Sequence, residues 1–194
     1  MTRSRSLAVF VCGVAVGALG VTMLLQLFGD HIHALAARGS QAQVEESLKI
    51  GLPIEGLRAK DILDTFDQRR ESDRAHEATD IMAPRGTPVH AVHDGTIRKL
   101  FTSRPGGLTI YQFDSSDTYC FYYAHLDRYE KGLAEGQSVQ QGAIIGYVGS
   151  SGNASPAAPH LHFAIVRLDP EKHWWDGTPI NPYPLLIHAQ ESAK

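Results

Sequence analysis

Residues 74–84, RAHEATDIMAP, contain two metal-competent side chains, His76 and Asp80, with Glu77 beside the histidine. On a helix these two side chains would share a face, as in the helical zinc peptidases that use a neighbouring glutamate as base. The flanks oppose a helix, because DQRRESDRA upstream has no apolar stripe and Pro84 follows closely. We therefore predict an extended segment in which Glu77 is not a base. A flat strand would separate positions 76 and 80 by about 13 Å, so the chain must bend between them.

The segment PHLHFAIVRL at 159–168 contains a second pair of candidates, His160 and His162. Alternate residues of a strand share a face, so these histidines would lie on one face, about 6.6 Å apart along the strand. The other face would carry the apolar residues Leu161, Phe163 and Ile165. On a helix the histidines would lie about 200° apart and could not act together. They are thus either a functional pair on a strand or two surface histidines.

A further candidate is His125, which closes the aromatic run TYCFYYAHLD at 118–127. Aromatic and β-branched residues favour a strand, in which the odd positions, among them Tyr123 and His125, would share a face. His125 is either a functional histidine at the end of this strand or a satisfied packing residue.

The elements that must position these residues have the pattern of a β domain. From Gly51 onward, short apolar runs are broken by Gly, Pro, Asn and Asp. The two runs of TPVHAVHDGTIRKLF are joined at Asp94–Gly95, a pair that favours a tight hairpin turn. Further strand candidates are GLTIYQF, TYCFYYAHL, GAIIGYVG and HLHFAIVRL. We predict a mainly β domain over residues 51–188, followed by a tail at 189–194.

The N-terminal part differs from this domain. Residues 7–28 carry no charge, and as a helix they would extend roughly 33 Å, enough to cross a hydrocarbon core of about 30 Å. Arginines in residues 1–6 precede this span, so the positive-inside rule places the N-terminus in the cytoplasm. We predict a single-pass anchor in the cytoplasmic membrane, a tether at 29–50 and a periplasmic β domain. The alternative is a cleaved signal peptide, because ALA at 34–36 resembles a cleavage site.

Taken together, the motifs resemble those of the M23 family of peptidoglycan metallopeptidases, the lysostaphin-like or LytM-domain endopeptidases. His76 and Asp80 match the family's H-x-x-x-D motif, His160-Leu161-His162 its H-x-H motif, and His125-Leu126 an H-L strand end between them. The likeness covers roughly residues 51–186. It implies an antiparallel β-sheet groove of the lysostaphin/LytM type, with its duplicated hybrid motif, preceded here by a transmembrane helix.

The resemblance implies that His76, Asp80 and His162 bind Zn²⁺, and that His125 and His160 are catalytic histidines beside it. Three protein ligands and one open position suit a hydrolytic zinc ion, which lowers the pKa of its bound water toward about 7 and polarises an amide carbonyl. One of the two remaining histidines could take the proton of the water while the other stabilises the oxyanion.

Other positions acquire expected roles from the resemblance. Tyr123, on the predicted face of His125, is expected either to position substrate or to pack across strands. Trp174-Trp175 is expected to form either a groove wall or a hydrophobic clasp for the C-terminal loop. The chain departs from the family pattern at Ala78, where glycine is common and bends more freely, and at Ala164, where many members have glutamate. Neither departure removes a ligand.

We therefore expect a zinc-dependent endopeptidase that hydrolyses amide bonds in peptidoglycan peptides and is attached to the membrane by its N-terminal helix. Other envelope proteins are candidate regulators. The alternative is a non-catalytic LytM-type module that binds the wall or activates a partner cell-wall hydrolase. Because the formal net charge is −3, with no basic stripe, we expect no nucleic-acid partner.

Overall fold

The computed structural model describes Val44, residues 48–69 and residues 75–192. All of these except Val44 belong to one compact unit, Glu45–Lys194. The predicted membrane span at 7–28 and most of the predicted tether lie outside the described residues. Within the described ranges, no helix combines the length and the apolar character needed to cross a membrane.

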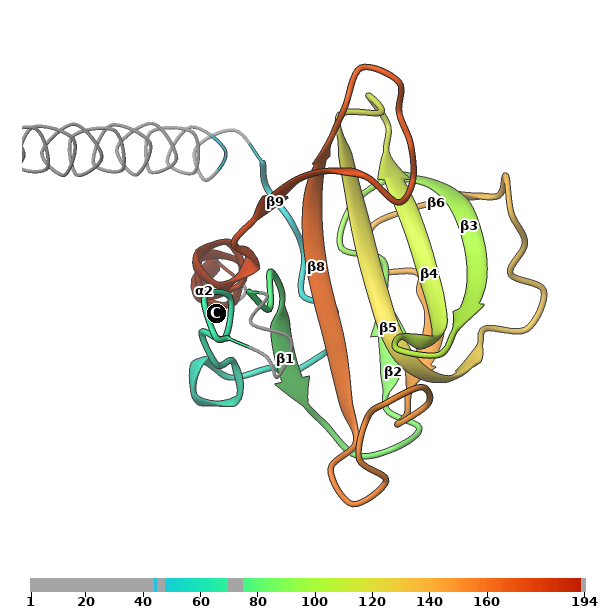
Figure 1. Ribbon diagram of the computed structural model, residues 1–194. Coiled ribbons are helices and arrows are strands. Elements are labelled where there is room, and N and C mark those ends of the chain that lie inside the picture. Colours follow the sequence, from blue (N-terminus) through green and yellow to red (C-terminus); the bar gives the residue numbers. More distant parts are fainter. Residues whose placement is uncertain (1–43, 45–47, 70–74, 193–194) are drawn as a thin grey trace, which may run out of the picture. The chain divides into compact units, whose positions relative to one another are not determined.

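The described part of this unit is mainly β, with nine strands in one antiparallel sheet (Figure 1). In chain order the strands are β1 (Thr79–Met82), β2 (Pro88–His90), β3 (Gly95–Ser103), β4 (Gly107–Asp114), β5 (Tyr119–Tyr129), β6 (Ser138–Val139), β7 (Ile144–Val148), β8 (His160–Leu168) and β9 (Gly177–Ile180). A short 3-10 helix, η1 (Ala59–Asp61), precedes them, and the helix α2 (Pro182–Ser192) follows them. The predicted mainly antiparallel β architecture is confirmed.

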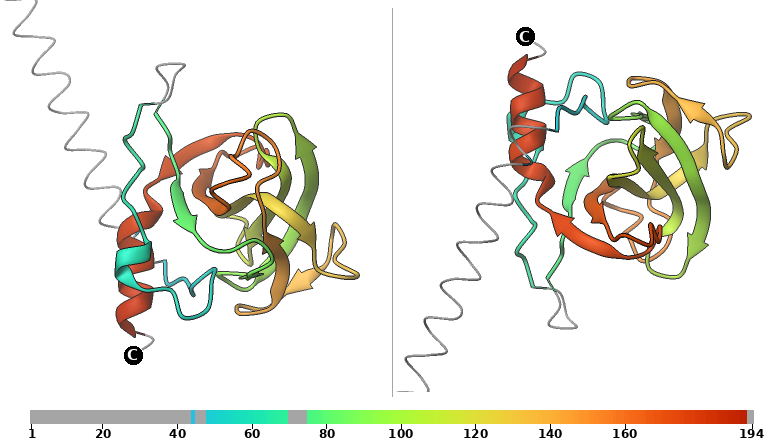
Figure 2. Two further views of the ribbon diagram at one scale, coloured as in Figure 1. Left: turned by 90° about the horizontal axis from the view of Figure 1, so that it is seen from below. Right: turned by 90° about the horizontal axis from the view of Figure 1, so that it is seen from above.

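Strand β5 lies at the centre of the sheet, whose main order is β1-β8-β5-β4-β3-β6. Residues 119–124 of β5 pair with β8, whereas its last residues, from Leu126 onward, pair with β7. The strand therefore changes partner at His125. Strand β8 pairs with β1 near its beginning and with β9 near its end. Figure 2 views the strands end-on and shows that the sheet is strongly curved.

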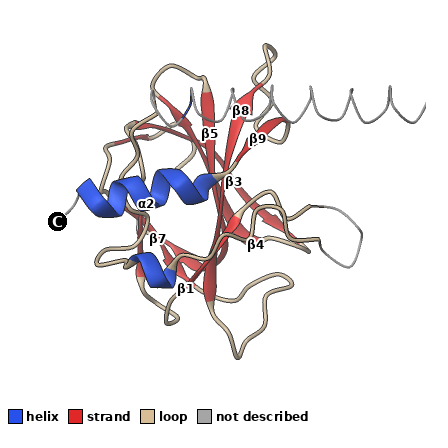
Figure 3. Ribbon diagram, turned by 90° about the vertical axis from the view of Figure 1, so that its left-hand side faces the viewer, coloured by secondary structure: helices blue, strands red, loops and turns tan. Residues whose placement is uncertain are grey.

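The two faces of β8 differ as the alternation predicts. Leu161, Phe163 and Ile165 have no exposed surface and belong to the core, while His160 and His162 are partly exposed. The helix α2 lies on the β1 side of the sheet (Figure 3) and buries two leucines, Leu185 and Leu186. It continues to Ser192, past the domain boundary predicted at residue 188.

The predicted hairpin at Asp94–Gly95 is wrong. Strand β2 ends at His90 and pairs with β7, whereas β3 begins at Gly95 and pairs with β4 and β6. Glycine is needed at position 95 for close approach, because a Cβ there would lie 1.9 Å from the carbonyl oxygen of Phe113 on β4. Asp94 supports the connection between β6 and β7, where its Oδ1 accepts a hydrogen bond of 2.7 Å from the amide of Gln141. Asp94 and Gly95 thus serve contacts with other strands and connections, and they do not form a two-residue turn.

Candidate metal centre

The three predicted ligands converge at the edge of the sheet. Asp80 on β1 lies directly opposite His162 on β8, and His76 precedes β1. Oδ1 of Asp80 is 2.9 Å from Nδ1 of His162 and 3.2 Å from Nε2 of His76, and the two histidine nitrogens are 3.0 Å apart. Within the described residues, this is the one group of three or more His, Cys, Asp or Glu side chains whose spacing could hold a metal ion.

The spacing fits a zinc ion. A tetrahedral ion about 2.0–2.1 Å from each ligand atom would hold those atoms roughly 3.3–3.4 Å apart. The observed separations of 2.9, 3.0 and 3.2 Å require only small outward adjustments. Burial lowers the pKa of His162 against the opposing effect of Asp80, so this imidazole is neutral at neutral pH. The neutral form is the one that binds metals.

The bend predicted between His76 and Asp80 occurs at Glu77, whose φ of 56° is left-handed. The backbone amides of His76 and Glu77 donate to carbonyls in residues 66–68, both at 2.9 Å, and hold the bend in place. Ala78 is fully buried and is not left-handed. Because the left-handed residue is its neighbour, the departure from glycine at position 78 does not prevent the bend. A left-handed conformation costs a glutamate on the order of 1 kcal/mol, which the two hydrogen bonds offset.

Thr65 supports both ends of this bent segment. Its carbonyl accepts a hydrogen bond of 3.1 Å from Nδ1 of His76, which fixes the tautomer in which Nε2 is free to bind a metal. Its Oγ1 donates to the carbonyl of Ala78 at 3.2 Å and accepts from the amide of Asp80 at 3.3 Å. Thr65 lies outside every motif identified in the sequence, so no pattern there could have indicated its position.

The two remaining candidates, His125 and His160, stand beside the three candidate ligands. Their ring centroids are 4.9 Å apart, and the ring of His125 is 5.6 Å from that of His162. Each Nδ1–H donates to a backbone carbonyl: His125 to Ser151 at 2.9 Å, and His160 to Ala158 at 3.0 Å. Both rings therefore carry their lone pair on Nε2. Burial lowers the pKa of His125 to about 4, against the opposing effect of the Ser151 carbonyl, so His125 is neutral at neutral pH.

His125 reaches the metal centre because the alternation of β5 breaks at this residue. The prediction that it shares a face with Tyr123 is wrong. Its φ of 60° is left-handed, and its amide donates to the carbonyl of Gly106 at 2.8 Å. The pairing of β5 with β4 also shifts register here, between the pairs Leu108↔Leu126 and Ile110↔Tyr123. In a regular strand, the side chain of His125 would instead follow Tyr123 into the core.

Tyr123 is a core residue, which corrects its predicted contact with substrate. Its side chain is fully buried, and its ring packs against Phe163 with centroids 5.3 Å apart. The hydroxyl donates to Oε1 of Gln112 at 2.8 Å and accepts from the amide of Val92 at 3.0 Å. The structure therefore shows the second of the two expected roles, packing across strands.

Tyr122, on the opposite face of β5, is the tyrosine beside the metal centre. Its ring meets that of His162 edge-on with centroids 5.9 Å apart, and it lines a cavity of about 300 Å³ together with Trp174 and Trp175. Trp174 packs against Tyr111 at 4.7 Å, whereas Trp175 is 63% exposed. Both tryptophans thus line the cavity, and Trp174 in addition packs against the sheet.

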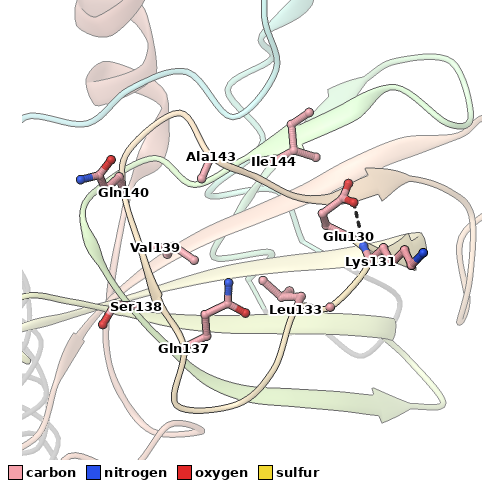
Figure 4. A pocket seen from close by; sticks show the side chains of 10 residues that line it. Glu130, Lys131, Leu133, Gln137, Ser138, Val139, Gln140, Ala143 and Ile144 are labelled. Atoms are coloured by element: carbon pink, nitrogen blue, oxygen red, sulfur yellow. Dashed lines mark hydrogen bonds between the residues drawn. The ribbon is translucent and has the colours of Figure 1, made fainter.

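A larger cavity, of about 530 Å³, lies in the connections around β6 (Figure 4). It is lined by ten residues between Glu130 and Ile144, none of them a histidine or a member of the metal centre. This larger cavity is therefore separate from the five histidine and aspartate candidates of the metal centre.

A curved antiparallel β domain with a converging His-Asp-His group and two further histidines has the donor set of a hydrolytic zinc site. The sequence model of peptidase family M23 matches residues 74–182, which include all five of these residues. The chain belongs to peptidase family M23. The family resemblance stated from the motifs is confirmed.

Two curated relatives show what kind of proteins the chain is similar to. It is 38% identical over 118 residues to the L-Ala–D-Glu endopeptidase of Bacillus subtilis, covering 58% of this chain and 35% of that protein. It is also 38% identical over 93 residues to the peptidoglycan DD-endopeptidase ShyC of Vibrio cholerae, covering 48% of this chain and 20% of that protein. The chain thus spans only about a third or less of the length of these relatives.

Two solved structures share the fold. The catalytic domain of the antimicrobial peptidase lysostaphin from Staphylococcus simulans superposes with a TM-score of 0.51 at 27% identity, covering 72% of this chain and 90% of that domain. A zinc-containing peptidase from Vibrio cholerae superposes with a TM-score of 0.52 at 25% identity, covering 61% of this chain and 36% of that one. These likenesses confirm the predicted lysostaphin/LytM fold, and the His-Asp-His group is consistent with zinc.

Proposed function

We propose that this chain is a zinc-dependent endopeptidase that hydrolyses amide bonds in peptidoglycan peptides. The observation that carries the proposal is the convergence of His76, Asp80 and His162 beside two histidines whose Nδ1 atoms are bonded to carbonyls. The endopeptidase names of the two relatives and the zinc in a structurally similar peptidase support it.

The residues divide into ligands and proton carriers. His76, Asp80 and His162 would hold the zinc, which supplies a Lewis acid that polarises the amide carbonyl and activates water. His125 is neutral and accepts a proton at Nε2, because its Nδ1–H already donates to the carbonyl of Ser151. His160, whose Nδ1–H donates to the carbonyl of Ala158, has its lone pair on Nε2, 3.9 Å from Oδ1 of Asp80; a proton taken up at this Nε2 would let His160 donate toward the developing negative charge.

A first experiment tests the activity. The full-length chain is purified in detergent, its zinc content is measured by mass spectrometry, and it is incubated with purified sacculi. We expect one zinc per chain and released muropeptides, with release stopped by a chelator and restored by zinc. His90→Ala, which changes a histidine outside the metal centre, serves as the matched control and should release muropeptides like the parent. One zinc per chain without any release would instead support the non-catalytic wall-binding or activator module.

We further propose that the peptidase domain works outside the cytoplasmic membrane, held by a single-pass anchor at residues 7–28. The absence of charge in this run and the arginines before it support the orientation. Envelope proteins that regulate the enzyme would then meet it on the same side as its substrate. Protease added to intact spheroplasts should digest a C-terminal tag on the full chain. A tag that stays protected until the membrane is lysed would refute this topology.

A further inference from the structure

Both candidate proton carriers are held by the same loop, residues 149–159 between β7 and β8. The carbonyl of Ser151 accepts a hydrogen bond of 2.9 Å from Nδ1–H of His125. The carbonyl of Ala158 accepts a hydrogen bond of 3.0 Å from Nδ1–H of His160. Because the partner of one ring nitrogen decides which nitrogen carries the lone pair, both Nε2 atoms depend on where this loop lies.

The first residue of the loop packs against β5 just beyond His125. Asp127 is the second residue after His125 on that strand. Glycine is needed at position 149, because a Cβ there would lie 2.7 Å from Cα of Asp127. The carbonyl of Gly149 also accepts a hydrogen bond of 3.3 Å from the amide of His160. The start of the loop is therefore in contact with the strands of both histidines.

Arg85 joins this loop to β5 through two hydrogen bonds. Its Nη1 donates to Oδ1 of Asp127 at 2.6 Å, and its Nη2 donates to the hydroxyl of Ser150, the residue before Ser151. The hydrogen bond from Arg85 lowers the pKa of Asp127, so the pair carries opposite charges at neutral pH. A planar guanidinium presents its donors in a fixed geometry and therefore holds the two acceptors at a fixed separation.

The turn that carries Arg85 is bound to the end of β7. The amide and the hydroxyl of Thr87 both donate to the carbonyl of Pro84, at 3.1 and 2.7 Å. The amide of Gly86 donates to the carbonyl of Val148 at 2.7 Å, and the amide of Val148 donates to the carbonyl of Thr87 at 2.9 Å. The backbone of Arg85 is thus anchored to the residue that immediately precedes the loop.

We propose that Arg85 is a positioning residue for the hydrolysis. By bonding Asp127 and Ser150 at the same time, it keeps the loop at a fixed distance from β5. The Ser151 carbonyl then stays against Nδ1–H of His125, and the lone pair stays on Nε2. The inference rests on the proposed endopeptidase function, in which this Nε2 accepts a proton.

Two other roles of Arg85 predict different kinetics. A surface ion pair alone would change neither kcat nor KM, because 51% of the Arg85 side chain is exposed and such pairs contribute little. An anchor for an anionic group of the substrate would act on KM, and that group would compete with the ionised Asp127 for the guanidinium. A positioning residue acts on kcat, so kinetics separate the three roles.

The kinetic test compares Arg85→Ala with the full-length zinc enzyme in detergent, using dye-labelled sacculi over a range of concentrations. Arg85→Ala should lower kcat about 5- to 20-fold, less than the roughly 10²-fold that a misplacement of 1 Å can cost, because Ser151 keeps its own bonds. KM should stay within about 2-fold of the parent, and the zinc content should stay unchanged. Arg85→Lys should regain part of the lost kcat, because an ammonium group can bond one of the two partners.

A second variant tests the link to the loop. Ser150→Ala removes the acceptor of Nη2 and leaves the ion pair between Arg85 and Asp127 in place. It should lower kcat about 3-fold or more, and the double variant Arg85→Ala/Ser150→Ala should be no slower than Arg85→Ala, because both changes break the same connection. The matched control is Arg128→Ala, which removes a guanidinium 3.0 Å from the other oxygen of the same carboxylate. It should retain kcat within about 2-fold.

A spectroscopic measurement needs no catalysis. Long-range proton–nitrogen spectra of the full zinc-loaded chain, labelled with ¹⁵N-histidine, report which ring nitrogen carries the proton, and His125→Gln identifies the signals of His125. The parent should have the proton on Nδ1, whereas Arg85→Ala should show a shifted signal or a mixture of tautomers.

The proposal is overturned if Arg85→Ala retains the kcat of the parent, if its loss appears in KM alone, or if the His125 signals of the two proteins coincide. If these signals differ but the parent releases no muropeptide, the endopeptidase function fails while the positioning role of Arg85 stands.

Discussion

The Nδ1–H of His125 donates a hydrogen bond of 2.9 Å to the backbone carbonyl of Ser151, a residue 26 positions later in the chain. Ser151 is itself fixed, because its Oγ accepts from the amide of Leu108 at 3.0 Å and donates to the carbonyl of Leu126 at 2.7 Å. One serine thus connects β4, β5 and the loop before β8 at the point where the candidate base stands. The orientation of His125 is therefore set by the tertiary structure and not by its own strand.

Substitutions of two histidines should separate metal binding from proton transfer. His125→Ala should retain one zinc per chain and lose about 10²- to 10⁴-fold in the rate of muropeptide release, because it removes the proton acceptor but no ligand. His162→Ala should lose the zinc, because it removes one of three ligands. Metal content and release are measured on the same samples. If His125→Ala cleaves sacculi as fast as the parent, the role of His125 is wrong.

Thr65→Val should weaken zinc binding although Thr65 is not a ligand. Valine keeps the shape of the side chain but removes the bonds of Oγ1 to the carbonyl of Ala78 and the amide of Asp80. Changes to residues that orient metal ligands commonly cost about 10- to 100-fold in affinity, and we expect the lower end of that range. Competition with a fluorescent chelator measures the affinity. Thr65→Ser should retain most of it; equal affinities for the Val and Ser variants would contradict this account.

Tyr123→Phe should destabilise the fold without changing the chemistry. The variant leaves Oε1 of Gln112 and the amide of Val92 without the tyrosine hydroxyl, which costs roughly 1–3 kcal/mol for buried polar groups. Urea unfolding measures this loss, and muropeptide release per folded molecule should stay unchanged. Tyr119→Phe on the same strand, where the side chain is partly exposed, should change stability by less than about 0.5 kcal/mol. A direct role of Tyr123 in substrate binding would instead show as a raised KM.

The hairpin between β4 and β5 should make stability depend on pH through Asp114. Burial raises the pKa of this carboxyl, but hydrogen bonds from Ser116, Thr118 and Tyr119 outweigh it, so the pKa lies below its ordinary value of 3.8. The folded state thus binds a proton less readily than the unfolded state. The stability contributed by the ionised group is present above pH 3.8 and is lost as the pH falls through the lower pKa of the folded state.

The measurement is urea unfolding of the parent and Asp114→Asn between pH 7 and pH 3. The free energy of unfolding of the parent should exceed that of the variant at neutral pH, and the difference should shrink below about pH 4. Taking the difference between the two proteins removes the contributions of other carboxylates. A difference that stays constant across this range would show that the charge of Asp114 contributes nothing.

The alternation of apolar residues correctly predicted which side chains share a face of β8. It did not do so for β5. The pattern of Leu161, Phe163 and Ile165 placed His160 and His162 on the opposite face, because one buried face determines the register of a regular strand. The same rule placed His125 with Tyr123 and failed, because a left-handed residue and a change of partner strand interrupt the alternation. The hairpin expected at Asp94–Gly95 failed for a related reason, since the turn residues serve contacts with distant strands.

The sequence by itself determined the family and the β architecture and predicted the three candidate ligand side chains, because residue types and their spacing are local properties. Tertiary structure decided what the residues between the motifs do. The bend lies at Glu77, and Thr65 contacts both His76 and Asp80. Tyr122, rather than the expected Tyr123, lies beside the metal centre. These outcomes depend on hydrogen bonds and packing between segments far apart in the chain, and no local pattern specifies which distant carbonyl or ring will be the partner.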